Sequence, residues 1–261
     1  MENKETRNLV KNSLGFDSNL YVYQDKNMFN YSVDTIMLGN FVFLNNKIEN
    51  MLEIGTNNGA LSIFISERSQ KLKIDAIEIQ QKACELAEKN IKLNKKNKQI
   101  KVINIDFNDF VIKHNKNANP KYDSIVCNPP FYTLENTKKN SKVSDEMLIA
   151  THEYKINLEQ IIYGSSKLIE QKGYLSLVIP VERLVDCFCL MRKYKFEPKR
   201  VQFIIPRIND KPKLVLVEGR YQAGWGVHFL PNLYLHDSNN KKEHYYLEEI
   251  KALYKPLKIK E

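Results

Sequence analysis

The chain has 261 residues, of which 43% are hydrophobic and 27% are charged. These values are ordinary for a folded domain, and they exclude a mainly disordered, fibrous or collagen-like chain. Lys and Arg number 40 against 31 Asp and Glu, which gives a formal net charge of +9. Most of the cations are Lys, so codon drift in an AT-rich genome can explain part of the excess. The charge alone is therefore weak evidence for a nucleic-acid partner.

The cysteines and the apolar segments exclude several other classes of protein. Cys84, Cys127, Cys187 and Cys189 form no Cys-x-x-Cys pair and have no histidine at the spacing of a zinc site, so we expect free, buried thiols and no metal. No signal peptide follows the polar N-terminus, and the longest apolar segment, residues 36–44, is far shorter than the ~20 residues that span a bilayer. We therefore expect a soluble, cytoplasmic protein that contacts no membrane. We separately expect a monomer.

The first 48 residues predict an N-terminal extension. Residues 1–18 are polar and unpatterned, which indicates a mobile tail. Residues 20–23 predict a short strand, and Ser32 and Asp34 can cap the helix that follows.

From Met51 onward, strand-like apolar runs alternate with helical patterns. Strands are expected at 51–54, 73–78, 100–105, 122–127, 174–179, 199–205 and 213–221, with a shorter run at 226–230. Helices are expected near 59–69, 80–95, 108–114, 157–171, 182–194 and 243–254. This alternation predicts an α/β domain over residues 49–261, with a seven-stranded, mostly parallel sheet and helices on both faces.

One stretch breaks the regular alternation. Residues 133–154 are long, charged and without a clear pattern, and they follow an apolar strand. Loops of this length inside a compact domain are usually either functional or disordered, and both interpretations stay open.

The first candidate motif is a strand followed by a turn of small residues, Glu53-Ile-Gly55-Thr-Asn57-Asn-Gly59. In an open α/β sheet, ligands lie beyond the carboxyl ends of the strands, where glycine lets ligand atoms approach the backbone. Asn57 stands where a further glycine is usual, and asparagine tolerates the left-handed conformation that such a turn needs. The motif fits a cofactor-binding turn and an ordinary strand-to-helix turn about equally well.

Acidic side chains stand at the ends of the next two predicted strands. Glu78, which precedes Ile79, is placed to accept hydrogen bonds from two ribose hydroxyls, although a solvated carboxylate is the alternative. Asp106 is placed to accept from an adenine amino group, with Phe107 against the ring, although it can equally cap the following helix.

The sharpest motif is Asn128-Pro129-Pro130-Phe131-Tyr132, directly after a predicted apolar strand. Its prolines fix the backbone at the carboxyl edge of the sheet. An exocyclic base amine is a poor nucleophile because its lone pair is delocalised into the ring. The Asn128 side-chain carbonyl and the Pro129 backbone carbonyl can accept its N–H groups and draw the nitrogen towards tetrahedral geometry, while Phe131 stacks on a flipped-out base. A plain Pro-Pro turn is the alternative.

In their order and spacing, these motifs resemble the class I, Rossmann-like S-adenosylmethionine-dependent methyltransferases that act on amino groups. The resemblance covers about residues 20–255. Residues 23–38 and Ala150-Thr151-His152-Glu153 are also similar to segments of the bacterial tRNA1(Val) adenine-37 N6-methyltransferase family. The resemblance implies that family's fold, S-adenosylmethionine as cofactor, tRNA as substrate, and methyl transfer to the N6 amine of adenine 37 in tRNA(Val).

The same resemblance implies the residues of the site. Catalysis is expected to depend on Asn128, Pro129, Pro130 and Phe131. Cofactor binding is expected from Glu53, Gly55, Asn57, Gly59, Glu78, Ile79, Asp106, Phe107 and Asn128. The charge pattern, rather than the resemblance, suggests RNA contacts from Arg7, Lys11, Tyr132, Lys138, Lys139 and Lys142. A further cationic cluster that is a candidate for RNA contacts consists of Arg192, Lys193, Lys195, Lys199 and Arg200. Each cationic cluster fits a solvated face as well.

The chain departs from the family pattern at two positions. Asn57 replaces the middle glycine of the cofactor turn, and Thr151 replaces the family's usual Arg, which puts any RNA contact of that Arg in doubt. Neither change removes a catalytic atom. At position 57 the side chain matters little, because the turn binds through its backbone.

Other functions fit parts of the pattern. Asn-Pro-Pro-[Phe/Tyr] also occurs in glutamine methyltransferases of release factors, but those carry a sizeable helical N-terminal domain, and only residues 1–50 precede the first sheet strand here. A DNA adenine methyltransferase is less favoured because no inserted target-recognition region is visible. The chain lacks the Gly-x-Gly-x-x-Gly spacing of a nicotinamide dehydrogenase. A non-enzymatic RNA-binding module stays an alternative, and it would not bind S-adenosylmethionine.

Overall fold

The computed structural model describes residues 9–16, 18–26, 28, 30–129, 156–237 and 244–259. The predictions made for Arg7, Pro130, Phe131, Tyr132, Lys138, Lys139, Lys142, Thr151 and the stretch 133–154 lie outside these residues. Within them, no helix has the length and apolar character that crossing a membrane requires. The same residues contain no group of three or more His, Cys, Asp or Glu side chains that could hold a metal ion.

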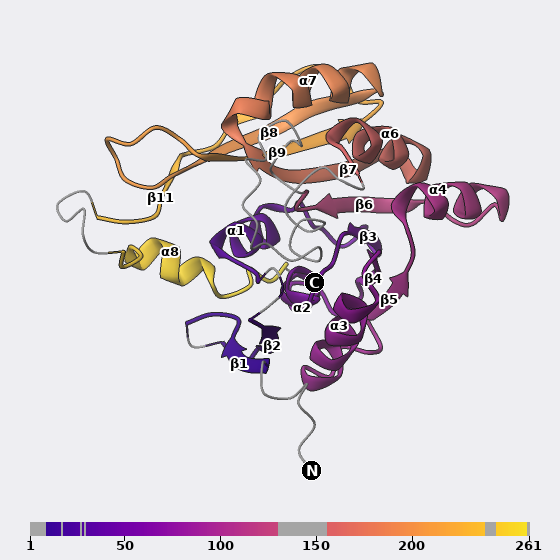
Figure 1. Ribbon diagram of the computed structural model, residues 1–261. Helices are drawn as coiled ribbons and strands as arrows, with labels where there is room; N and C mark the ends of the chain where they lie inside the picture. The colour runs from indigo at the N-terminus through magenta and orange to yellow at the C-terminus, as the bar shows by residue number, and fades with distance from the viewer. Residues whose placement is uncertain are drawn as a thin grey trace, which may run out of the picture.

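A mixed sheet forms the centre of the described chain (Figure 1). Its strands are β3 (Asn50–Ile54), β4 (Lys73–Glu78), β5 (Ile100–Asn104), β6 (Tyr122–Cys127), β7 (Ile169–Pro180), β8 (Phe196–Ile205), β9 (Leu214–Tyr221), β10 (His228–Phe229) and β11 (Leu233–Tyr234). They lie in the order β10-β8-β9-β7-β6-β3-β4-β5, and β11 also pairs with β8. Neighbours are parallel except at β9, which runs antiparallel to β7 and β8. The predicted α/β fold with a mostly parallel sheet is confirmed.

Helices cover both faces of this sheet. They are α1 (Val33–Phe41), α2 (Ala60–Ser66), α3 (Gln81–Leu93), α4 (Phe107–Lys116), α6 (Leu158–Leu168), α7 (Leu184–Lys193, after the 3-10 turn Val181–Arg183) and α8 (Glu248–Leu253). Alternate strand residues point to opposite faces, so Met51 packs with α1 and α2 while Leu52 packs with α4 and α6. Figure 1 shows α6 and α7 on one side of the sheet and α1, α2 and α8 on the other. Burial on both faces explains why the strands are nearly continuous apolar runs.

The strand order reverses beside β3. From β3 the chain continues to β4 and β5 on one side, and it then returns to β6 on the other side of β3. The carboxyl ends of β3, β4, β5 and β6 therefore meet at one edge, and the crevice at such a reversal is where open α/β sheets bind ligands.

Two predictions about element boundaries were wrong. The helix expected over 157–171 ends at Leu168, and β7 begins at once because Ile169 is fully buried and pairs with Tyr122 of β6. Gly173, the expected end of that helix, lies inside β7 beside an irregularity in the pairing with β6. The terminal helix expected over 243–254 is shorter, with bounds Glu248–Leu253.

The expected mobile tail over residues 1–18 was also wrong in part. Strand β1 (Leu9–Ser13) pairs antiparallel with β2 (Tyr21–Asp25). Side-chain amides of α3 hold this hairpin: Asn90 accepts from the Tyr23 backbone N–H at 2.7 Å, and Asn94 accepts from the Tyr21 N–H at 3.0 Å. The sequence around the hairpin does not predict these hydrogen bonds, because Asn90 and Asn94 lie about 70 residues further along the chain. The division of the chain at residue 48 stays a prediction.

The cysteine prediction was correct for three residues and wrong for one. All four are free thiols, and Cys84, Cys127 and Cys187 are buried, whereas Cys189 is exposed on α7. Burial raises the pKa of the Cys84 thiol to about 11 and also raises that of Cys127, which keeps both protonated near neutral pH.

Arginine side chains fix the C-terminal end of α1. Arg68 donates to the backbone carbonyls of Gly39 and Val42, both at 2.7 Å. Arg200 donates to the carbonyl of Phe41 and lies over its ring. Carbonyls in the last turn of a helix lack partners inside it, and the two guanidinium groups satisfy those of Gly39 and Phe41. Helix α1 is therefore held at a defined place beside the sheet.

A buried carboxylate completes this anchor. Glu218 of β9 is 1% exposed and pairs with Arg200 at 2.8 Å. It also accepts from the Ser176 hydroxyl at 2.7 Å and from the Phe43 backbone N–H at 2.9 Å. Arg200, which the sequence placed in a cationic run, thus serves mainly to hold α1 to the sheet.

Candidate functional site

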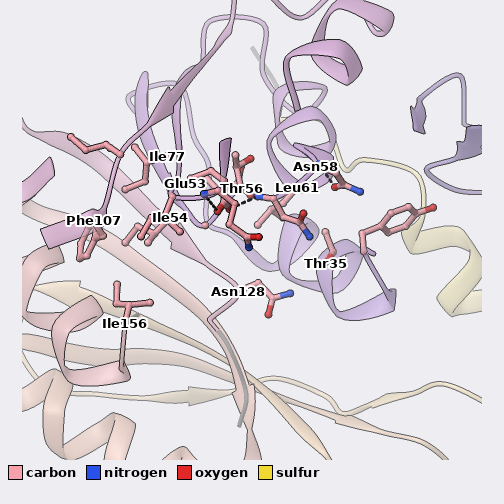
Figure 2. Close-up of a pocket in the computed structure, with 18 of the residues that line it drawn as sticks. Thr35, Glu53, Ile54, Thr56, Asn58, Leu61, Ile77, Phe107, Asn128 and Ile156 are labelled. Atoms are coloured by element: carbon pink, nitrogen blue, oxygen red, sulfur yellow. Dashed lines mark hydrogen bonds between the residues drawn. The ribbon is translucent and has the colours of Figure 1, made fainter. Parts of the chain in front are cut away.

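A cavity lies at the carboxyl ends of β3, β4, β5 and β6, where the strand order reverses. It is lined by Tyr31, Thr35, Glu53, Ile54, Gly55, Thr56, Asn57, Asn58, Ala60, Leu61, Ile77, Glu78, Ile79, Gln80, Ile105, Asp106, Phe107, Asn128 and Ile156. Figure 2 shows Glu53, Thr56 and Asn58 on one side, with Phe107, Ile156 and Asn128 around the rest. Four widely separated segments that the sequence singled out are thus brought together here.

The turn after β3 forms the floor of the cavity. Gly55 has φ +73 and donates its N–H to the Ile77 carbonyl at 2.9 Å. A Cβ atom built on Gly55 would meet nothing within 4 Å, so its exposed backbone faces open space that a ligand can fill. Asn57 has φ +50, which confirms that asparagine supports the left-handed conformation predicted for it.

Gly59 belongs to the same motif but does not line the cavity. It has φ +80, and a Cβ atom there would lie 3.3 Å from that of Ala87. Its small size therefore lets α2 begin close to α3. The expected contact between Gly59 and a cofactor stays a prediction, and the position of Gly59 outside the cavity lining does not support it.

Glu53 is buried beneath the turn, where it is 2% exposed. Its carboxylate accepts hydrogen bonds from the hydroxyl of Thr56 at 2.7 Å and from that of Ser62. Burial raises its pKa to about 7, although the two hydroxyls act against the shift. Glu53 thus ties the end of β3 to the turn and to the first turns of α2, besides lining the cavity.

This carboxyl group predicts a pH dependence of stability. Because the pKa of Glu53 is about 7 in the folded protein and near 4.5 otherwise, the unfolded chain releases the proton first as the pH rises. The free energy of unfolding should therefore fall between these two values and level off above pH ~7. Glu53→Gln keeps an oxygen acceptor but cannot titrate, so urea unfolding at pH 5 and pH 8 should show a smaller change for the variant. The same change in both proteins would contradict the assignment.

Glu78 joins the ends of β3 and β4. Its two oxygens accept backbone N–H groups from Asn57 at 3.0 Å and from Gln80 at 2.9 Å. Burial raises its pKa, and these backbone hydrogen bonds oppose that shift. The Ile79 backbone also hydrogen-bonds to this carboxylate. A carboxylate has about four lone-pair sites, so these bonds still leave room for a ribose hydroxyl. Ile79 also lines the cavity, and its predicted contact with the cofactor stays a prediction.

Asp106 caps helix α4, which was the alternative to a contact with adenine. Its Oδ1 accepts from the backbone N–H groups of Asn108 at 2.8 Å and Asp109 at 3.4 Å, so it caps the first turn of α4. It also lines the cavity, so capping does not exclude a ligand contact. Phe107 is 5% exposed, with its ring against α6 and an edge in the cavity wall.

Asn128 lines the cavity and comes immediately after β6. Its Nδ2 donates to Oδ2 of Asp34 on α1 at 2.9 Å. The following Pro129 is buried. The sequence identified Asn128 but gave no sign that its partner would come from a segment 94 residues earlier.

Two buried polar atoms of the lining lack a partner among the described residues. Asn58 Nδ2 and Gln80 Oε1 are both buried and form no hydrogen bond there. Such atoms are costly unless a ligand or water satisfies them. A polar ligand with donors and acceptors, lying against the exposed backbone of Gly55, fits this donor set.

Sequence reasoning missed several lining residues. Tyr31 and Thr35 belong to the segment before and within α1, which the sequence interpreted only as a capped helix. Asn58 and Ile156 also line the cavity. The resemblance of residues 23–38 to a family segment was the one signal that could have marked α1 as part of the site.

Of the predicted RNA-contact residues Arg7, Lys11, Tyr132, Lys138, Lys139 and Lys142, only Lys11 lies within the described part of the chain. It is exposed on β1, and its Nζ lies 4.5 Å from the centre of the Tyr21 ring. That hairpin packs on α3 rather than lining the cavity. A contact between Lys11 and RNA stays a prediction.

Comparisons with known proteins agree with this geometry. The model of the methyltransferase small domain family matches residues 22–186. The tRNA1(Val) (adenine(37)-N6)-methyltransferase of Christiangramia forsetii is 27% identical, over 91% of this chain and 94% of that protein. The protein of the same name from Flavobacterium psychrophilum is 28% identical, over 69% and 74%. A predicted O-methyltransferase of Agrobacterium tumefaciens has a similar structure, with TM-score 0.65 and 16% identity over 87% of this chain and 98% of that one.

Proposed function

The chain belongs to the methyltransferase small domain family, and from this premise we propose that it transfers a methyl group from S-adenosylmethionine to the N6 amine of an adenine in tRNA. The observation that carries the proposal is that Asn128 lines the cavity with its amide held by Asp34. The substrate is suggested by the relatives named above, one of which aligns with 91% of the chain. Their names point to adenine 37 of tRNA(Val). We also propose that the enzyme acts in the cytoplasm, where a bacterial tRNA substrate would be.

The residues of the cavity fit S-adenosylmethionine. The open backbone at Gly55 would lie against its amino-acid part, Glu78 would accept from its ribose hydroxyls, and Asp106 with Phe107 would border its adenine. Asn58 Nδ2 and Gln80 Oε1 offer a donor and an acceptor that the described residues do not use. When bound, this cofactor supplies an electrophilic methyl group on a sulfonium.

Asn128 and Pro129 would prepare the amine. The side-chain carbonyl of Asn128 and the backbone carbonyl of Pro129 accept its two N–H groups, which turns the nitrogen lone pair out of the ring plane. No strong base is needed, because the amine becomes acidic only as the new N–C bond forms and its proton can then pass to water. Most of the rate enhancement would therefore come from position and polarisation.

The net charge of +9 would favour binding of tRNA, because tRNA is a polyanion. Binding to tRNA should weaken steeply as salt rises, because phosphate contacts release counterions. The predicted contacts Lys138, Lys139 and Lys142, which follow the catalytic motif in the sequence, and Arg7 and Tyr132 remain part of this proposal.

Identification of the product tests the proposal. The protein is incubated with labelled S-adenosylmethionine and total tRNA, the RNA is digested, and the modified nucleoside is identified by mass spectrometry. We expect N6-methyladenosine. A methylated guanine, or label found only in protein, would instead identify a different amino-group acceptor, such as the glutamine of a release factor.

Packing behind Phe107 gives a prediction for cofactor affinity. A Cβ atom at Gly164 of α6 would lie 2.4 Å from Cε1 and 2.7 Å from Cζ of Phe107, so Gly164→Ala must displace that ring from the cavity wall. We expect about 1–3 kcal/mol of lost stability from overpacking. Affinity for S-adenosylmethionine, measured by isothermal titration calorimetry, should fall roughly tenfold, or ~1.4 kcal/mol. Gly224→Ala is the matched control, because its Cβ atom meets nothing within 4 Å. Equal affinities in the two variants would argue against a role for Phe107.

A further inference from the structure

A hydrogen bond links Asn128, the first residue of the catalytic motif, to the N-terminal part of the chain. Asn128 Nδ2 lies 2.9 Å from Oδ2 of Asp34, which is in the first turn of α1. Asp34 is 1% exposed, and its other oxygen accepts from the hydroxyl of Ser32. Both oxygens of this buried carboxylate are therefore engaged, one of them by the proposed catalytic amide.

The polarity of this contact decides which way the amide faces. A carboxylate only accepts hydrogen bonds, so the NH₂ group of Asn128 must face Asp34. The amide oxygen then points to the other side of the group. The two ends of an amide have nearly the same shape, so packing alone would hardly choose between the two orientations. Only the orientation with the oxygen towards the substrate can accept an N–H from the amine.

Asp34 is itself held in place. The end of α1 is fixed by Arg68 and Arg200, which bind its last carbonyls. The helix also packs closely on α2, because a Cβ atom at Gly39 would come within 2.6 Å of the Phe64 ring. The carboxylate is thus part of a rigid support rather than a mobile surface group.

We propose that Asp34 is a positioning residue, which holds the Asn128 amide with its oxygen towards the substrate amine. It acts through Asn128 and does not touch the reacting atoms. The proposal rests on the proposed function, since it concerns the same amide and the same amine.

A set of three variants tests the proposal against a purely structural role. In Asn128→Asp, two carboxylates face each other, and we expect kcat to fall by about 10²-fold or more, as misplaced catalytic groups typically show. In Asp34→Asn, the new amide can pair with either orientation of Asn128, so kcat should fall by about tenfold while the KM for S-adenosylmethionine stays within about twofold.

The double variant Asp34→Asn/Asn128→Asp gives the decisive result. Its hydrogen bond runs in reverse, from the amide at position 34 to the carboxylate at position 128, and the second carboxylate oxygen is left to accept from the amine. We expect its kcat to exceed that of Asn128→Asp alone by at least about tenfold, a coupling that double-variant cycles detect. Losses that simply multiply, or a double variant no better than Asn128→Asp, would overturn the proposal.

Asp123→Asn is the matched control. Asp123 lies near the start of β6, at the end of the strand opposite to the one that Asn128 follows, and its Oδ2 accepts from the backbone N–H groups of Glu49 and Asn50 at 3.0 and 2.9 Å. This variant should change stability but not kcat, and titration with S-adenosylmethionine will confirm that each variant is folded. The acceptor of the unmodified protein is determined first. If it is a protein glutamine rather than tRNA, the proposed function fails while the same cycle, run on that acceptor, still decides the role of Asp34.

Discussion

Replacing Asn128 with alanine should lower the rate of methyl transfer by about 10²–10³-fold, the usual effect of removing one group that stabilises the developing charge of a reaction. The variant loses the side-chain carbonyl that accepts from the amine. It keeps Gly55, Glu78 and Asp106, so the affinity for S-adenosylmethionine should change by less than about threefold, or ~0.7 kcal/mol. Single-turnover assays with tRNA and calorimetry with the cofactor measure the two quantities separately.

The control for this variant is Asn115→Ala. Asn115 lies near the end of α4 and donates to the Val111 carbonyl, without lining the cavity. It should transfer methyl groups at the normal rate. If Asn128→Ala retained near-normal turnover, the proposed role of its amide would be wrong. If it lost cofactor affinity instead, Asn128 would be a binding residue only.

Glu218→Ala should be the most destabilising of the single substitutions proposed. It leaves the positive charge of Arg200 without its partner and removes the acceptor of the Phe43 N–H and the Ser176 hydroxyl. Breaking a buried ion pair from one side typically costs about 3–5 kcal/mol, and the lower end of this range applies because the Arg200 side chain is 26% exposed. We expect a loss of that size in the free energy of unfolding from urea titrations. Because the same network holds the end of α1, catalysis should suffer too, through Asp34.

Glu248→Ala provides the comparison for this loss. Glu248 is also a salt-bridge partner, with Lys251 at 2.7 Å, but its side chain is 88% exposed. Exposed pairs contribute about 0–1 kcal/mol, so this variant should unfold almost as the unmodified protein does. Equal losses in the two variants would show that burial of Glu218 is not what makes its network important.

The sequence predicted the parts of the fold that depend on local pattern. Apolar runs located the strands from β3 to β9, and the turn after β3 was predicted together with the conformation of Asn57. The end of α6 was missed because Ile169 fits a helix by local pattern but pairs with Tyr122 of β6 in the structure. Tertiary contacts outweigh local preference at such a junction.

In the site, too, the sequence predicted what the fold class fixes and missed what tertiary packing decides. Residues at strand ends, such as Glu78 and Asn128, were identified because the fold class fixes where strand ends meet. Asp34 was noted only as a helix cap, since its contact with Asn128 depends on how α1 packs against the sheet. The structure also shows that Asp106 caps α4 while lining the cavity. The two interpretations offered for that residue were not exclusive.

Methylation of a single defined tRNA tests the central claim most directly. Two transcripts of tRNA(Val), identical except for adenine or guanine at position 37, are incubated with the protein and S-adenosylmethionine, and the methyl groups incorporated per tRNA are counted. The account predicts one N6-methyladenosine in the adenine transcript and none in the guanine transcript. Equal incorporation into both transcripts, or none into either, would contradict it.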